Sequence, residues 1–285
     1  MQNGETQRML ELLLLPPMLK AFIAIVVGGL AFPACGVMVL RLDLVPLRYA
    51  LMHGVILGGA IALALELPSL PLIIIVNMLV VVLVLKLQSN NSISSAAAMV
   101  FTMGLASLIM HLYDVPAKDS LQLLWGSPFA LTYLDLAVLI ALCIILFIYI
   151  AMNFKKIVAL FFDSEIAGSL GINTKFHYSF MVVMIALTVA LAMRLIGALL
   201  IDALLILPVL IASKYSKGTK ELFIKSSLTG VFLSVLGYLC SLLYNFPLSA
   251  TIALSAALMY LILTVIEKIK INKRYKNEKD NFVAN

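Results

Sequence analysis

The sequence predicts an all-α polytopic membrane protein with eight or nine transmembrane segments. Of its 285 residues, 63% are hydrophobic and only 12% are charged, and the mean hydropathy is +1.11. Soluble domains average about half apolar and about a quarter charged residues, so a soluble fold of this length would leave much of this apolar surface in water. The lipid bilayer is the solvent that fits this composition.

The spans follow from runs of about 20 mostly apolar residues, the length that crosses a bilayer as a helix. Two runs, 176–197 and 198–213, are continuous, so one of them can be a short or re-entrant half-helix. No long soluble segment interrupts the chain, which predicts a single transmembrane domain over 1–285, with spans at about 19–266 and a basic tail at 267–285. The runs are 19–40, 47–66, 70–87, 95–113, 132–152, 176–197, 198–213, 222–244 and 248–266.

The positions of Lys and Arg predict the orientation, because cytoplasmic loops of membrane proteins carry an excess of these residues. When the nine runs alternate sides, most basic residues fall on one face together with the tail KIKINKRYKNEK, and this face is therefore cytoplasmic. The N-terminus is then outside, whereas eight spans would place it inside. The tail is expected to be a solvated, partly disordered end near anionic lipid. The net charge of +6 is thus explained by the basic residues in cytoplasmic loops and in the tail, and it predicts no nucleic-acid partner.

The three cysteines, Cys35, Cys143 and Cys240, lie in apolar runs. They are expected to pack as small side chains without a disulfide framework. Cys35 lies in FPACG, but the preceding Phe-Pro fits a lipoprotein cleavage site poorly. Because the first 40 residues lack a short hydrophobic region with a cleavage signal, the first run is expected to remain an uncleaved membrane segment.

Small residues mark the second run as a packing helix. Gly54 and Gly58 are four residues apart in RYALMHGVILGGA, and such spacing lets membrane helices approach closely. We expect the helix at 47–66 to pack near the centre of the bundle, where a pore would lie.

A short polar insertion, FFDSEIAGSLGINTKF, separates the runs that end at 152 and begin at 176. Asp163 can cap a helix N-terminus, Glu165 favours its first turn, and Gly171 is a natural terminator. Ile166 and Leu170 give this helix one apolar face. It is expected to dock on a partner on the cytoplasmic side; the alternative is that it lies on lipid.

With this insertion, the sequence resembles the permease subunits of metal-ion ABC importers, which carry zinc, manganese or iron. DSEIAGSLGI (163–172) is similar to the family's cytoplasmic coupling helix, Asp-x-Glu-x-Ala-x-x-x-Gly-Ile, with Ala167 and Gly171 at matching positions. IGALLIDALLILPVLIA (196–212) resembles a family segment of the form Gly-x-Leu-Leu-x-x-Ala-Leu-Leu-Ile-x-Pro. LLWGSPFALTYLDL (123–136) is similar to its outer loop. FPLSATIAL (246–254) is similar to the start of its last helix, with Ser249 where Gly is usual.

The resemblance covers about 18–266 and implies the vitamin B12 permease-like, type II ABC importer architecture. In that architecture a second permease copy or a paralogue completes a dimer with one pore at the interface. A separate ABC ATPase binds the coupling helix, and an extracytoplasmic substrate-binding protein delivers the substrate. The resemblance also implies a bacterial cytoplasmic membrane location and transport of a divalent metal ion, with zinc or manganese as the first candidates.

The chain itself is expected to be non-catalytic. It contains no G-x-x-x-x-G-K-[ST] phosphate loop, so it cannot cradle ATP phosphates in the usual way. Helical spacing places no Ser/His/Asp or Cys/His set of side chains close together in the sequence, so no catalytic residues are assigned. No permanently bound cofactor is expected, and the metal ion is cargo.

In the family, a His at the position of His53 lines the permeation path, and an acidic residue four positions earlier often shares its helix face. Such an i, i+4 pair would suit transient coordination of a divalent cation. Here Tyr49 replaces the acid, and Arg48 beside it would repel a cation. His53 is therefore expected either to line the pathway as a metal ligand or to pack against a helix, bonded to a carbonyl or a Ser.

Asp202 is the second candidate, because an ionisable side chain within a membrane segment is a functional hypothesis by default. Either Arg194, eight residues earlier, neutralises it, or it serves in the pathway as a metal ligand and supplies the charge missing at Tyr49. The remaining candidates are Glu66, His111 and Asp114, which could form an outer mouth or be ordinary interfacial residues, and His177, which is expected to flank a cytoplasmic helix start.

Two alternatives to import of a free metal ion remain open. One is a permease of the same architecture for a substrate that is not a free ion, such as a metal chelate, which Tyr49 and Arg48 favour. The other is a proton-coupled secondary transporter acting through His53 and Asp202. An inverted internal repeat would be its sign, and none is evident.

Overall fold

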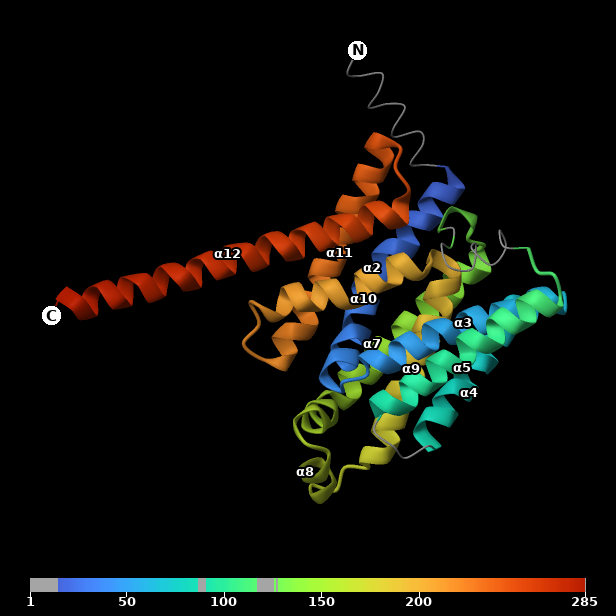
Figure 1. Ribbon diagram of the computed structural model, residues 1–285, viewed down its shortest axis with the longest axis horizontal. Helices are drawn as coiled ribbons and strands as arrows, with labels where there is room; N and C mark the ends of the chain where they lie inside the picture. Colours follow the sequence, from blue (N-terminus) through green and yellow to red (C-terminus); the bar gives the residue numbers. More distant parts are fainter. Residues whose placement is uncertain (1–14, 87–90, 117–125, 127, 285) are drawn as a thin grey trace, which may run out of the picture.

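The computed structural model describes residues 15–86, 91–116, 126 and 128–284, and this part of the chain is helical with no strand (Figure 1). Within the described ranges, eight helices are long and apolar enough to cross a membrane, and α10 is a shorter apolar helix. The predicted all-α membrane fold is confirmed. The helices are α2 (Pro16–Arg41), α3 (Val45–Ala64), α4 (Ser69–Lys86), α5 (Asn91–Leu112), η1 (Pro128–Ala130), α7 (Tyr133–Phe162), α8 (Ser164–Ser169), α9 (Thr174–Ile196), α10 (Ala198–Ser213), α11 (Thr219–Tyr244) and α12 (Leu248–Ala284).

The continuous apolar run at 176–213 is broken at Gly197. This residue has φ of 96°, in the region that favours glycine, and it separates α9 from α10. A Cβ added at Gly126 would lie 2.3 Å from the Gly197 nitrogen, so Gly126 packs directly on the break. The long run is therefore two helices that meet at a sharp corner.

The direction of α10 decides between the two topologies. At its beginning, Ser249 at the start of α12 donates to the Ile196 carbonyl at 3.4 Å. At its end, Ser213 lines one cleft together with Arg41 at the end of α2 and Thr219 at the start of α11. Hence α10 runs back to the face that carries α8, and the beginning of α2 lies on the opposite face. This matches the alternation of the nine runs, in which the face that carries α8 is the one predicted to be cytoplasmic.

Glycine allows a close approach between the backbones of α2 and α11. A Cβ at Gly230 would lie 2.1 Å from the Gly29 carbonyl oxygen, and a Cβ at Gly29 would lie 2.3 Å from Ser234 Oγ. Along α3, a Cβ at Gly54 would lie 2.7 Å from Asn77 Oδ1, and one at Gly58 would lie 2.7 Å from the Ile73 Cα. Both of these α3 glycines therefore face α4.

The α2–α11 contact gives a stability prediction. Gly230→Ala forces a methyl group against the α2 backbone, and overpacking of this kind costs about 1–3 kcal/mol. Thermal unfolding of the purified protein in detergent should show a lower melting temperature. Gly104→Ala is the matched control because its Cβ would meet nothing within 4 Å and alanine favours a helix. Equal melting temperatures for Gly230→Ala and wild type would contradict the tight contact.

The C-terminal tail differs from its expectation. Instead of ending in a partly disordered segment, α12 continues as one helix to Ala284 and projects beyond the bundle (Figure 1). The segment after 267 contains no proline or glycine and is rich in Lys, which is a good helix former. Local propensity therefore extends the membrane helix beyond its apolar part.

Cysteine labelling tests the orientation. With the native cysteines replaced, cysteines at Ser216 and Asn277 should resist a membrane-impermeant thiol reagent in intact cells and react after permeabilisation. A cysteine at Asn245, an exposed residue between α11 and α12, lies on the opposite face and should react in both cases. The reverse pattern would invert the orientation.

Candidate functional site

One face of α3 carries polar side chains within the membrane-spanning part of the chain. Tyr49 is exposed, and His53, one turn later, is partly buried. Because these residues are four apart, they lie on the same side of the helix. The Nδ1 atom of His53 is buried and has no hydrogen-bond partner. The alternative of a packing histidine satisfied by a carbonyl or a Ser therefore has no support at this nitrogen.

Asp202 lies on α10, and Arg48 of α3 neutralises it. The Arg48 guanidinium donates from Nη1 to Asp202 Oδ1 and forms a salt bridge with it. The arginine side chain is only 4% exposed, whereas the aspartate side chain is 35% exposed. The Arg48 Cζ atom also lies 4.3 Å from the centre of the Tyr49 ring. Arg48, Tyr49 and Asp202 thus form one cluster that joins α3 to α10.

The proposed pairing of Arg194 with Asp202 is wrong. Arg194 Nη1 instead donates to Asp135 of α7 at 3.1 Å, and its Nε donates to Ser69 of α4 at 3.0 Å. The interval of eight residues suggests a shared face only if the helix is continuous. Gly197 interrupts that helix, so the side chains before and after it point to different neighbours.

The carboxylate of Asp202 is therefore paired with Arg48 in this structure, and its role as the charge missing at Tyr49 stays a prediction. Among the described residues, no group of three or more His, Cys, Asp or Glu side chains is placed to hold a metal ion. In one copy of the chain, the α3 and α10 face offers a partly exposed carboxylate, a phenol and an imidazole. Such groups are costly in contact with hydrocarbon, so water or protein must cover this face.

The other ionisable candidates lie at helix ends. Glu66 and Asp114 follow α3 and α5 with positive φ of 52° and 48°, and both are exposed, as is His111. His177 differs from its expectation as a simple flank. It lies near the start of α9, as predicted, but is buried, and its Nδ1 lies 3.0 Å from Tyr149 Oη.

The insertion after α7 folds as the short helix α8, which lies at one end of the bundle (Figure 1). Asp163 caps it by accepting from the Glu165 and Ile166 nitrogens at 2.7 and 2.9 Å. Ala167 is fully buried against the bundle, whereas Ile166 and Leu170 are 57% and 71% exposed.

The end of α8 is as well defined as its start. Gly171 has φ of 78°, and the Ile172 nitrogen donates back to the Ala167 carbonyl at 3.2 Å. The helix is shorter than the predicted 163–172 because Asp163 is the cap and 170–172 form the closing turn. The short helix α8 is therefore capped at both ends and has one buried and one exposed apolar side.

Comparison with known sequences now assigns the family. The sequence model described as "ABC 3 transport family" matches residues 15–267. The chain belongs to the ABC 3 transport family. Its relatives include "Manganese import system permease protein ScaB" of Streptococcus gordonii, which is 26% identical over 85% of this chain and 88% of that protein. "High-affinity zinc uptake system membrane protein ZnuB" of Buchnera aphidicola is 26% identical over 56% of this chain and 62% of that protein.

Solved structures support the same architecture for this ABC 3 chain. "PsaBC from Streptococcus pneumoniae in complex with Fab" superposes with a TM-score of 0.78 at 22% identity, covering 90% of this chain and 94% of that one. A structure entitled "An inward-facing conformation of a putative metal-chelate type ABC transporter" gives 0.70 at 18% identity, covering 87% of each chain. The predicted ABC importer permease architecture is confirmed at the level of the fold.

Sequence reasoning missed the partner of Asp202 in this ABC 3 permease. The signal was present, because Arg48 and Asp202 have opposite signs and both lie within predicted spans, and intramembrane charges tend to pair with one another. What the sequence did not reveal was that α3 and α10, 154 residues apart at these positions, are neighbours.

Proposed function

We propose that this chain is the permease subunit of an ATP-driven importer that moves a divalent metal ion, manganese or zinc first, across the bacterial cytoplasmic membrane. Membership of the ABC 3 transport family and the manganese and zinc import named for relatives support this substrate class. The observation that carries the proposal is the partly exposed polar face of α3 and α10 within the membrane, on the same chain as a capped cytoplasmic helix.

The pathway runs along Tyr49, His53 and Asp202. A second copy of the chain, or a paralogue, covers this face, so that two such faces enclose one pore. Partial exposure of Asp202 in the single chain fits this arrangement, because the carboxylate would otherwise meet lipid. Gly54 and Gly58 support the pathway by letting α3 pack closely on α4.

Arg48 holds the carboxylate of Asp202 when no cation is present. An entering divalent ion competes with the guanidinium for that carboxylate and gains the free Nδ1 of His53 as a nitrogen ligand. Because a divalent cation brings one more positive charge than an arginine, it can displace the guanidinium where the site is shielded from water. Arg48 is thereby a substitute counter-ion that keeps the empty pathway electrically neutral.

The energy comes from outside this chain. A separate ABC ATPase binds the coupling helix, represented by Asp163, Glu165, Ile166, Ala167, Leu170 and Gly171. Ile166 and Leu170 enter a groove of the ATPase, while buried Ala167 transmits its movement to the bundle. An extracytoplasmic substrate-binding protein delivers the ion to the opposite face. The chain is therefore non-catalytic, and the metal ion is its cargo.

Uptake into proteoliposomes tests the proposal. The permease and its ATPase are reconstituted together. Accumulation of manganese, zinc and iron is then measured with ATP, without ATP, and with a non-hydrolysable ATP analogue. ATP-dependent accumulation of one free divalent ion is the expected result. Accumulation that follows a proton gradient without ATP would contradict it.

A metal chelate is the second candidate substrate, and the Arg48–Asp202 pair favours it. With the carboxylate neutralised and a phenol at Tyr49, the face offers no free negative charge to an unchelated cation. The same proteoliposomes distinguish the two substrates: uptake that requires the chelator and is absent for the free ion series would identify the chelate.

A further inference from the structure

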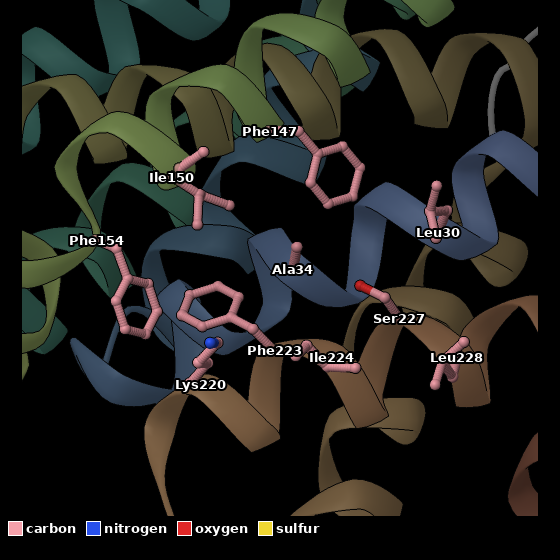
Figure 2. Close-up of a pocket in the computed structure, with 11 residues that line it drawn as sticks. Leu30, Ala34, Phe147, Ile150, Phe154, Lys220, Phe223, Ile224, Ser227 and Leu228 are labelled. Atoms are coloured by element: carbon pink, nitrogen blue, oxygen red, sulfur yellow. The ribbon is translucent and has the colours of Figure 1, made fainter.

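An apolar groove lies between α2, α7 and α11, away from the α3–α10 cluster in sequence and in lining residues (Figure 2). It encloses a cavity of about 350 Å³. At one end, Phe154 of α7 and Phe223 of α11 lie beside Lys220, and at the other end Leu30 of α2 lies near Leu228 of α11. Among the described residues that line the groove, Lys220 is the one that carries a charge.

The lysine end of the groove opens into a second, basic hollow along the same two helices. Lys217, Lys220 and Lys225 line this hollow together with one acidic residue, Glu221. It shares four lining residues with the apolar groove: Phe154, Lys220, Ile224 and Leu228. Lys225 pairs with Glu221 of its own helix. The ammonium groups of Lys217 and Lys220 form no ion pair with any residue in the described ranges. The hollow therefore has positive charge left to offer an external anion.

The depth of the groove matches one leaflet of a bilayer. Lys220 lies at the start of α11, on the face of the bundle that carries α8. Leu228 is eight residues further along the helix, which corresponds to about 12 Å. Half of the hydrocarbon core is about 15 Å thick. The groove thus runs from the cytoplasmic interface to near the bilayer centre.

We propose that this groove binds an anionic phospholipid of the cytoplasmic leaflet, with one acyl chain between α7 and α11 and its phosphate at Lys217 and Lys220. Ile224 and Leu228 are more than half exposed in the groove wall, and at this depth the surroundings are lipid. A basic pocket at the cytoplasmic ends of membrane helices attracts acidic headgroups. The apolar length of the groove therefore fits the acyl chain of an anionic phospholipid, and its basic end fits the phosphate of the same lipid.

The test uses the purified permease–ATPase complex, depleted of lipid in detergent and then supplied with equal amounts of phosphatidylglycerol and phosphatidylcholine. Native mass spectrometry measures which lipid stays bound. Phosphatidylglycerol should be retained preferentially by wild type. Each lysine near a membrane surface contributes about fivefold in affinity for acidic lipid, so Lys217→Gln with Lys220→Gln should reduce this preference by roughly 25-fold. Lys268→Gln, an exposed lysine on α12, should leave it unchanged.

A photoactivatable phosphatidylglycerol with a diazirine on its acyl chain locates the bound lipid. Cross-links should fall on the segments around Phe154 and Ile224, and Ile224→Ala should weaken them whereas Leu239→Ala, an exposed position on α11 outside the groove, should not. Equal retention of the two lipids by wild type, or an unchanged preference in the double lysine variant, would overturn the proposal. Cross-links of the lipid that spread evenly over all exposed helices would overturn the proposal as well. So would a finding that a segment of the ATPase, and not the lipid, occupies the groove.

Discussion

Ile166→Asp is expected to abolish ATP-driven uptake while leaving the membrane fold intact. The side chain is 57% exposed on α8, outside the bilayer, so its replacement removes no buried contact within the chain, and exposed substitutions of this kind usually change stability by less than about 0.5 kcal/mol. If Ile166 enters a groove of the ATPase, however, the substitution replaces an apolar anchor of the interface with a buried charge. Loss of such an anchor costs about 2 kcal/mol or more, or roughly 30-fold in affinity.

Two measurements separate these effects. Co-purification with the ATPase and transport should both be lost in Ile166→Asp and in Leu170→Asp, while the melting temperature of the isolated permease stays at the wild-type value. Ile269→Asp provides the control, because Ile269 is also an exposed apolar residue but lies on the α12 extension. Normal ATPase binding in both α8 variants would exclude this helix as the coupling element.

The sequence predicted α8 because every signal for it is local. Asp163 caps the helix and Gly171 closes it within nine residues, and both act on backbone groups of the same segment. The long spans were predictable for a related reason, since membrane length and hydropathy are properties of a continuous run. Even the break at Gly197 was partly visible, because 176–213 is too long for one span and too short for two full ones.

Contacts between distant segments were not predictable in this way. Tyr149 and His177 meet across the α7–α9 connection, and the sequence shows the histidine only as a polar residue at a helix start. Arg194 was assigned to the wrong carboxylate, because its actual partner Asp135 belongs to another helix. Periodicity reports which face of a helix a residue occupies, but the neighbour that covers this face depends on how the helices pack.

The Arg48–Asp202 pair is expected to show the second large effect, and stability and transport should respond differently. Removing either partner leaves the other charge unpaired inside the bundle, and broken buried pairs cost about 3 kcal/mol or more. Arg48→Met and Asp202→Asn should therefore each lower the melting temperature strongly. The double variant removes both charges together and should recover most of the lost stability, because the two effects are coupled.

Transport by the same three variants tests the pathway itself. If Asp202 is a ligand of the moving cation, the double variant should fold well and still fail to take up metal, as should His53→Ala, whereas Tyr49→Phe should matter less.

Arg48→Met, where it can be stabilised by lower temperature, should bind manganese more tightly than wild type because the competing guanidinium is gone. Asp135→Asn with Arg194→Met removes a second salt bridge between helices, away from Asp202, and should not alter metal affinity. Full uptake by the Arg48→Met, Asp202→Asn double variant would show that the pair only holds α3 to α10. The cation would then cross without a charged ligand, and a neutral or chelated substrate would explain the site better.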